Sequence, residues 1–411
     1  MTAIEVPREA PIPFREALRF WLKLGFISFG GPAGQIAVMH QELVERRRWI
    51  SERRFLHALN YCMLLPGPEA QQLATYIGWL MHRTWGGIVA GGLFVLPALA
   101  ILTALSWAYS TYGDTELVTA LFFGVKPAVV VVVAFAAYRI GKRVLHNGTL
   151  FTIALAAFVA LFEFNVPFPL IIVSAALIGF LGDRMAPERF RTGGAHEIAA
   201  TAHAPAIIDD DTPAPAHAQF RWPHALLTLV IGLLLWLGGM AALVLLQTPS
   251  GTLPTMGLFF TKAAFLTFGG AYAVLPYVYQ GAVSQYRWLT PRQMIDGLAL
   301  GETTPGPLIM VVAFVGYVGA WTHAVPSTSL PVAGLFGGLC ATYFTFLPSF
   351  LLILVGAPIV EGTRGNLKFS APLTSITAAV ALFRFKVGII PVVLASAVVG
   401  IALSFWRTMM P

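Results

Sequence analysis

The fold is decided by residues 20–68, FWLKLGFISFGGPAGQIAVMHQELVERRRWISERRFLHALNYCMLLPGP, because this stretch has a second copy at residues 259–307. At a constant shift of 239 positions and without a gap, 15 of the 49 residues are identical. Ordinary composition gives roughly three or four identities by chance. The chain therefore contains an internal repeat, and its identical residues include many helix breakers and cations.

The identical residues cluster in three short motifs, which are a glycine pair after phenylalanine, an Arg-Trp pair and a Pro-Gly-Pro turn. The motif pairs are Phe29-Gly30-Gly31 with Phe268-Gly269-Gly270, Arg48-Trp49 with Arg287-Trp288, and Pro66-Gly67-Pro68 with Pro305-Gly306-Pro307. A repeat kept only for packing would more readily retain apolar residues. Glycine and proline at corresponding places in two apolar halves are typical of a transporter with broken helices.

Composition independently indicates the class of protein. Hydrophobic residues make up 57% of the chain and charged residues only 11%, about half the usual share for soluble domains. Four apolar runs are long enough to cross a hydrocarbon core of about 30 Å. These runs are Gly86–Tyr109, Leu117–Tyr138, Leu226–Leu246 and Val332–Val355. The sequence therefore predicts an all-α polytopic membrane protein, a chain in contact with the lipid bilayer.

The net charge of +7 could suggest a nucleic-acid partner, but the basic residues fall in short loops between apolar runs. In a membrane protein such residues set orientation, so we predict no nucleic-acid partner. Residues 183–221 carry Ala, Pro, His and Asp and are predicted to be a disordered cytoplasmic linker. This linker separates an N-terminal transporter repeat, residues 1–182, from a C-terminal one, residues 222–411. Its histidines and aspartates are irregularly spaced, so we predict neither a metal site nor a cofactor.

Loop charge then predicts the topology. If each motif segment is a re-entrant hairpin, turning at Gly30-Gly31-Pro32 and at Pro66-Gly67-Pro68, the basic loop Arg46–Arg54 stays on the side of the basic N-terminus. The linker then lies on that side too, and the second repeat enters from the opposite side. The two repeats are therefore expected to be inverted, with both chain ends cytoplasmic. The inversion holds as well if both motif segments span the membrane fully.

The sequences FISFGGPAGQIAVMH (26–40), RRRWISERRF (46–55), FLTFGGAYAVLPY (265–277) and RWLTPRQMIDGLALGETTPGPL (287–308) resemble the chromate ion transporter family. The likeness is to its long-chain members, in which two homologous halves are fused, and it covers nearly the whole chain except the tail and the linker. It implies export of chromate across the bacterial cytoplasmic (inner) membrane, chromate resistance, and sulfate as a look-alike competitor. Ion gradients or the membrane potential are the expected drive, and a homodimer is left open.

Chromate is a tetrahedral dianion, and at mid-membrane it needs hydrogen-bond donors and positive potential. The N-termini of half-helices supply both, glycine lets the backbone approach a ligand closely, and proline suits the first helical position. We therefore predict that four such N-termini converge on the anion. The candidate substrate-binding residues at these turns are Gly30, Gly31, Pro32, Gln35, Pro66, Gly67, Pro68, Gly269, Gly270, Pro305, Gly306 and Pro307.

Ionisable residues inside apolar segments add further candidates. Lys23, Lys126 and Lys262 are costly in the membrane and are expected to face water, protein or the anion, although Lys23 and Lys262 could instead reach the headgroup region. Glu69 and Glu302 are candidates for carrying a coupling proton, and Glu69 could alternatively stabilise a helix N-terminus. Glu69 aligns with Leu308 and Glu302 with Met63, so the two halves are not chemically equal.

Two other classes of function remain to be weighed. The sequence has no HExxH, GxSxG or phosphate-binding P-loop, so we predict that the protein is not an enzyme. The alternative is a transporter of the same fold that carries sulfate or another anion, or that runs inward. Tetrahedral dianions of similar size differ little in charge or shape, so the sequence does not separate these two substrates.

Overall fold

The structure is a computed structural model that describes residues 12–363 apart from several gaps. The gaps are residues 30, 114, 117–130, 132–133, 135–136, 139–140, 143–144, 146, 165, 186–205, 214, 268–270 and 324–327. Within the described part every regular element is a helix, and the one isolated bridge joins Ile50 to Ile208. The predicted all-α class is confirmed.

The helices of the first half precede the linker and include a π-helix, η1. They are α1 (Phe14–Ile27), α2 (Gly31–His40), η1 (Gln41–Arg46), α3 (Glu52–Cys62), α4 (Glu69–Tyr112), α6 (Gly148–Phe162) and α7 (Phe168–Met185). A 3-10 turn in the linker, η2 (Ala216–Ala218), leads to the second half. The helices there are α9 (Trp222–Leu246), α10 (Thr252–Leu266), α11 (Ala271–Tyr279), η3 (Gln280–Gln285), α12 (Pro291–Thr303), η4 (Leu308–Met310), α13 (Val311–Thr322) and α14 (Leu330–Thr363).

Three of the described helices, α4, α9 and α14, are long and apolar enough to cross a membrane, with mean hydropathies of 2.4, 2.6 and 2.0. They contain three of the four predicted apolar runs, and the fourth, Leu117–Tyr138, falls mostly outside the described residues. Only 11% of the apolar window of α9 is buried, and its leucines other than Leu243 are exposed. Such a surface needs lipid around it, because soluble monomers rarely expose so large an apolar face. The chain is therefore an all-α membrane protein.

The two copies of the repeat adopt the same local structure. The π-helices η1 and η3 lie at the same place in each copy, 239 residues apart. Each is followed by an arginine with positive φ, Arg48 at 52° and Arg287 at 53°. The next helix in each copy has a hydroxyl N-cap, Ser51 for α3 and Thr290 for α12. The sequence identity therefore corresponds to shared backbone geometry.

Both copies are broken at the glycine and proline motifs. The first copy breaks between α1 and α2 and between α3 and α4, and the second between α10 and α11 and between α12 and η4. The pieces are short, since α1 has 14 residues and α3 has 11. At 1.5 Å per residue these are about 21 Å and 17 Å, less than the ~30 Å hydrocarbon core.

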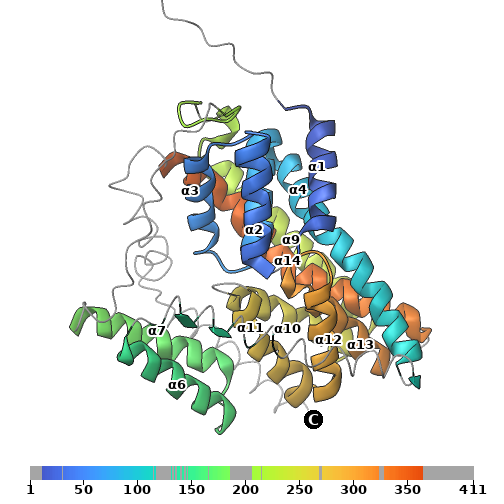
Figure 1. Cartoon of the computed structure of the whole chain (residues 1–411). Helices are drawn as coiled ribbons and strands as arrows, with labels where there is room; N and C mark the ends of the chain where they lie inside the picture. Colours follow the sequence, from blue (N-terminus) through green and yellow to red (C-terminus); the bar gives the residue numbers. More distant parts are fainter. Residues whose placement is uncertain are drawn as a thin grey trace, which may run out of the picture.

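Helix α4 reverses direction at His82 and Arg83, where the backbone leaves the helical region. The two legs pack so closely that a Cβ on Gly78 would lie 2.4 Å from the Gly86 carbonyl oxygen and 2.4 Å from the Ala90 Cβ. The second leg is long, and in Figure 1 it runs from the first copy of the repeat to the far end of the second. Glycine at the contact is what permits two backbones to approach this closely.

The two halves complete each other's hydrophobic cores. The core of the first copy, with Leu24 and Phe55, is joined by three residues from α14. These are Ile353, Ala357 and Val360. The core of the second copy, with Phe260 and Phe314, is joined by residues from α4. These are Val95, Ala98 and Leu102. The first copy lies above the second in Figure 1, and the two long helices tie them together.

The structure describes residues 206–213 and 215–221 of the predicted linker, and this part contacts the first half. Ile207 and Ile208 donate backbone hydrogen bonds to the carbonyl oxygens of Arg48 and Trp49, at 2.9 and 3.0 Å. The segment thus pairs with the extended backbone after η1, which composition alone does not reveal. This contact places the linker and the Arg46–Arg54 loop at the same end of the molecule. Helix α7 continues to Met185, slightly past the predicted linker boundary, and residues 186–205 lie outside the described part.

Candidate functional site

The residue that precedes the Phe-Gly-Gly motif of each copy bonds to the Pro-Gly-Pro turn of the other copy. The Gly67 N–H donates to the Thr267 carbonyl oxygen at 2.7 Å, and the Gly306 N–H donates to the Ser28 carbonyl oxygen at 2.8 Å. Shifting every number by 239 turns one bond into the other, which is the reciprocity that a two-fold axis produces. We call this meeting point, formed by Ser28, Gly67, Thr267 and Gly306, the crossing.

Four helices begin next to the crossing. They are α2 at Gly31, α4 at Glu69, α11 at Ala271 and η4 at Leu308. Helix α2 contacts α4, and η4 contacts both α4 and α11. Pro68 and Pro307 are the N-cap residues, one place earlier than the first helical position expected from the sequence. The first N–H groups of a helix lack partners within it and carry partial positive charge, so this region is suited to an anion.

The glycines at the turns are required by the backbone. Gly31 has φ of 69°, Gly67 of 129° and Gly306 of 108°, a region that residues with a Cβ rarely adopt. A Cβ on Gly67 would also lie 2.8 Å from the Ser349 Oγ, and one on Gly306 would lie 2.5 Å from the Ala98 Cβ. The Gly67 and Gly306 turns therefore have no space for a Cβ, and no other residue fits at either position without strain.

Buried polar side chains gather on one side of the crossing, beside Gly67. The Ser349 hydroxyl donates to Gln71 Oε1 at 2.7 Å, and Gln71 Nε2 donates to Thr75 Oγ1 at 2.9 Å. All three side chains are at most 1% exposed. Groups such as these are costly to bury unless they are hydrogen-bonded, so the network fixes their positions.

Two further glutamines hold the turns themselves. Gln72 Nε2 donates to the Pro66 carbonyl oxygen at 2.9 Å, and Gln35 Nε2 donates to the Gly306 carbonyl oxygen. Both side chains are at most 1% exposed. Gln72 Oε1 has no hydrogen-bond partner among the described residues. It is therefore an acceptor available to a hydroxyl or to water beside the Gly67 turn.

The second half carries apolar residues where the first carries these polar ones. At the shift of 239, the counterparts of Gln35, Gln71, Gln72 and Thr75 are Val274, Met310, Val311 and Phe314. The chemical inequality noted for the carboxylates therefore extends to the whole crossing. The backbone follows a two-fold relation and the side chains do not, so the buried hydrogen-bonding side chains are concentrated on the polar side, around Gly67.

The two carboxylates lie near different turns. Glu69 is the first residue of α4 and is 8% exposed, which fits its predicted alternative role at a helix N-terminus. Glu302 accepts a hydrogen bond of 2.8 Å from the Tyr272 hydroxyl. That hydroxyl lies 3.7 Å from where a Cβ on Gly31 would be. Tyr272 thus links Glu302 to the glycine turn of the first copy. Sequence reasoning missed this tyrosine, because its counterpart, Ala33, gives no signal.

The structure describes two of the three predicted lysines. Lys23 on α1 and Lys262 on α10 are exposed, on the helix faces opposite the buried ones. Their position favours the alternative, in which the amines reach the headgroup region. Lys126, Gly30, Gly269 and Gly270 lie outside the described residues. Pro32 follows the start of α2, and Pro305 precedes the Gly306 turn. No group of three His, Cys, Asp or Glu in the described ranges could hold a metal ion.

A buried ion pair joins the two halves, and sequence reasoning missed it. Arg54 on α3 and Glu361 near the end of α14 are both 0% exposed, with Nη2 and Oε2 2.7 Å apart. The Tyr76 hydroxyl also donates to Glu361, and Arg54 Nη1 donates to the Asp209 carbonyl oxygen at 3.0 Å. One signal was available, since Glu361 is an isolated carboxylate at the end of a long apolar run.

Comparison with known proteins places the chain in a family. The family model described as chromate transporter matches residues 15–180 and 254–410, which correspond to the two halves. The chain is 32% identical over 372 residues to a chromate transport protein of Pseudomonas aeruginosa, covering 90% of this chain and 79% of that protein. It is 31% identical over 351 residues to one of Cupriavidus metallidurans, covering 84% and 74%. A probable chromate transport protein of Synechococcus elongatus is 29% identical over 368 residues, covering 89% and 81%. No solved structure matches the chain.

Proposed function

The chain belongs to the chromate transporter family, and from this premise we propose that it is a secondary transporter that exports chromate across the bacterial cytoplasmic membrane and so confers chromate resistance. The observation that carries the proposal is the crossing, where the N-termini of broken helices from both repeats meet beside buried polar side chains. Family relatives that are named as transport proteins also support transport rather than catalysis.

The crossing offers what a tetrahedral dianion needs in a membrane. The first turns of α2 and α4 provide N–H groups and the positive ends of helix dipoles, without a fixed charge that would bind the anion too tightly to release it. The side-chain amides of Gln71 and Gln72 lie beside the Gly67 turn, and the second N–H of each would orient the oxyanion, while the Ser349 hydroxyl holds Gln71 in place. We propose that chromate binds on this polar side, with Gly67 giving the backbone close access.

The two-fold relation at the crossing supports a transport cycle. Repeats related in this way can exchange conformations about a central site, so that the site opens first to one side of the membrane and then to the other. The crossing itself is held by one backbone hydrogen bond at each turn and by the Gln35 side chain on Gly306, and a small rotation can break and reform such bonds. We propose that the halves rock about the crossing and that the repeats are inverted in the membrane.

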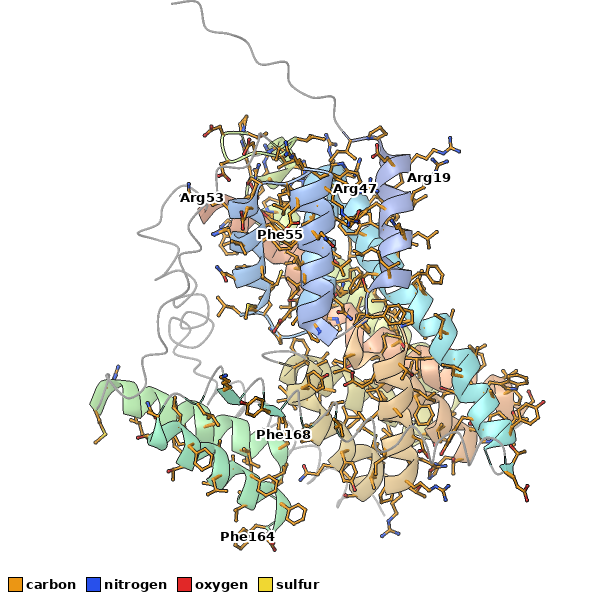
Figure 2. The ribbon with its side chains drawn as sticks, in the orientation of Figure 1. Arg19, Arg47, Arg53, Phe55, Phe164 and Phe168 are labelled. Atoms are coloured by element: carbon orange, nitrogen blue, oxygen red, sulfur yellow. The ribbon has the colours of Figure 1, made fainter. Side chains whose placement is uncertain are left out.

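The distribution of basic residues supports an orientation. Arg19, Arg47 and Arg53 lie toward one end of the molecule, whereas Phe164 lies toward the other (Figure 2). His82 Nε2 lies 2.9 Å from the Ile12 carbonyl oxygen, so the Arg83 turn belongs to the same basic end. Positive residues collect on the cytoplasmic side of membrane proteins. We propose that this end, with the N-terminus and the linker, faces the cytoplasm.

We also propose that a carboxylate couples transport to protons. Glu69 stands at the start of α4 beside the polar side of the crossing, and Glu302 is held by Tyr272 at the opposite turn. A carboxyl group in an apolar environment next to an anion gains or loses a proton as the anion arrives or leaves. Either residue would let a proton gradient drive anion movement.

Everted membrane vesicles test the function. Uptake of labelled chromate into such vesicles, stimulated by a pH gradient or a membrane potential, is expected, with sulfate competing weakly. Uptake of sulfate in preference to chromate would replace the substrate, and uptake only by right-side-out vesicles would reverse the direction. Orientation is tested separately with single cysteines at Gln219 and Ser284, both exposed. They should react with an impermeant thiol reagent from opposite sides, and reaction from one side would end the inverted arrangement.

A further inference from the structure

A second polar site lies away from the crossing, at the basic end of the molecule. It is a cavity of about 400 Å³ between the reversal of α4, the ordered end of the linker, the start of α9 and the last part of α14. His217 fixes this arrangement, because its Nε2 lies 3.1 Å from the Trp79 carbonyl oxygen. The cavity is thus bounded by segments from both halves.

The lining of the cavity is basic. Arg83, His217, Arg221 and His224 all line it, the two arginines supply its fixed positive charge, and no carboxylate lines it among the described residues. Glu361 lies near His217, but its charge is balanced by Arg54. Helix α9 begins at Trp222, directly after Arg221, so the positive end of its dipole faces the same region. A site with this charge attracts an oxyanion.

Arg83 has a strained backbone conformation, and its side chain lines the cavity. Its φ is 59° and its ψ is −159°, in the middle of α4. For a residue with a Cβ this conformation costs free energy, and strain of this kind concentrates at functional sites. The close packing of the two α4 legs at Gly78 and Gly86 holds the reversal in place. The turn therefore presents an arginine to the cavity in a fixed position.

The apolar surface next to the cavity indicates what kind of oxyanion fits. Trp222 is 71% exposed, and Leu226 and Leu227, one turn further along α9, are 55% and 57% exposed. Such a surface faces acyl chains, and an exposed tryptophan at the start of a membrane helix marks the headgroup level. The basic cavity therefore lies where the polar headgroups of one leaflet meet the hydrocarbon.

We propose that this cavity binds the phosphate group of an anionic phospholipid, with the acyl chains lying along α9. A free phosphate, sulfate or chromate ion presents the same tetrahedral oxygens to Arg83 and Arg221. It would leave the adjacent leucines uncovered, however, whereas a lipid satisfies both the charged and the apolar parts of the site. The inference requires that α9 faces lipid, and it is independent of which anion the protein transports.

Native mass spectrometry of the purified protein tests the proposal. The protein is released from nanodiscs that contain phosphatidylcholine with a minor fraction of phosphatidylglycerol, and retained lipid is counted. We expect one phosphatidylglycerol to be retained per chain, and Arg83→Gln combined with Arg221→Gln to weaken its retention about tenfold or more. Arg19→Gln combined with Arg53→Gln is the matched control, since it removes two exposed arginines that do not line the cavity.

Folding is checked by size-exclusion profile and thermal midpoint in pure phosphatidylcholine, where the charged site has no anionic ligand. Equal loss of lipid from the two double variants would overturn the proposal, because general surface charge would then explain retention. Competition by millimolar inorganic phosphate, with no preference for phosphatidylglycerol over phosphatidylcholine, would also overturn it and make the cavity a site for a free oxyanion.

Discussion

The buried Arg54–Glu361 pair allows a sharp test of how the two halves are held together. Both side chains are fully buried, and the pair joins residues 307 positions apart. Removing one partner by Arg54→Met or Glu361→Gln leaves the other charge buried without its counter-ion. Loss of one member of a buried pair costs about 3–5 kcal/mol of folding free energy. Each single variant should therefore be strongly destabilised.

The double variant, Arg54→Met with Glu361→Gln, should be much less destabilised than the sum of the two single changes. It removes both charges together, so no uncompensated charge remains buried. We expect a coupling free energy of about 2 kcal/mol or more between the two sites. Arg54 also donates to the linker carbonyl of Asp209, so its single variant should lose slightly more than that of Glu361.

Unfolding by sodium dodecyl sulfate in mixed micelles measures these free energies on the purified protein. The exposed pair Arg47–Glu16, at 3.4 Å and with side chains 30% and 51% exposed, is the control. A pair that exposed is worth about 0–1 kcal/mol, so Arg47→Met and Glu16→Gln should add almost independently. If the Arg54 and Glu361 effects also add to within about 0.5 kcal/mol, the pair does not hold the halves together and the reasoning is refuted.

The remaining predictions concern the crossing and the linker. Gly67→Ala should weaken chromate binding about tenfold or more, measured by isothermal titration, because the new Cβ would displace the side-chain ends of Gln72 and Ser349. Gly306→Ala should mainly lower the thermal midpoint, because its Cβ would meet the Cβ of Ala98, on helix α4, at 2.5 Å. The reverse ranking would contradict this assignment. Glu302→Gln should abolish transport driven by a pH gradient, and Tyr272→Phe should reduce that transport severalfold. Exchange of chromate at equilibrium should be unchanged in both variants. If gradient-driven uptake into vesicles is unaltered in Glu302→Gln, Glu302 is not the proton carrier. Burial lowers the pKa of His217 below its usual 6.5, so this residue stabilises the docked linker at pH above 6.5, and its contribution is lost as the pH falls through the lowered pKa. Proteolysis of the linker should therefore rise on acidification, and His217→Gln should reduce this pH dependence.

Much of the fold could be predicted because it depends on local backbone chemistry. Gly67 and Gly306 occupy a region of positive φ that other residues avoid, and the prolines beside them end one helix and precede the next. These demands act within a few residues, so they are visible in the sequence and are repeated at a constant shift. The apolar runs that became α4, α9 and α14 are visible for the same reason, since their length and hydropathy are sums over neighbouring residues.

The partners across the crossing could not be predicted, because they come from segments far apart in the chain. Nothing near Gln71 indicates that Ser349 donates to it, and nothing near Gln35 indicates Gly306. The ordered end of the linker is a similar case, because its composition is that of a disordered segment and its order comes from pairing with the backbone at Arg48. Such contacts are fixed by how helices pack, and packing depends on all the side chains at an interface at once.

The sequence by itself therefore determined the repeat, the broken helices, the membrane class and the inequality of the two halves. Only the tertiary structure decided that the polar residues of the first half gather beside Gly67, that Lys23 and Lys262 are exposed, and that α14 enters the first core. The physical reason is that a residue's backbone preference is a local property, whereas the direction of its side chain relative to a distant segment follows from the position of the whole helix. That position is set by burying apolar surface between the two halves.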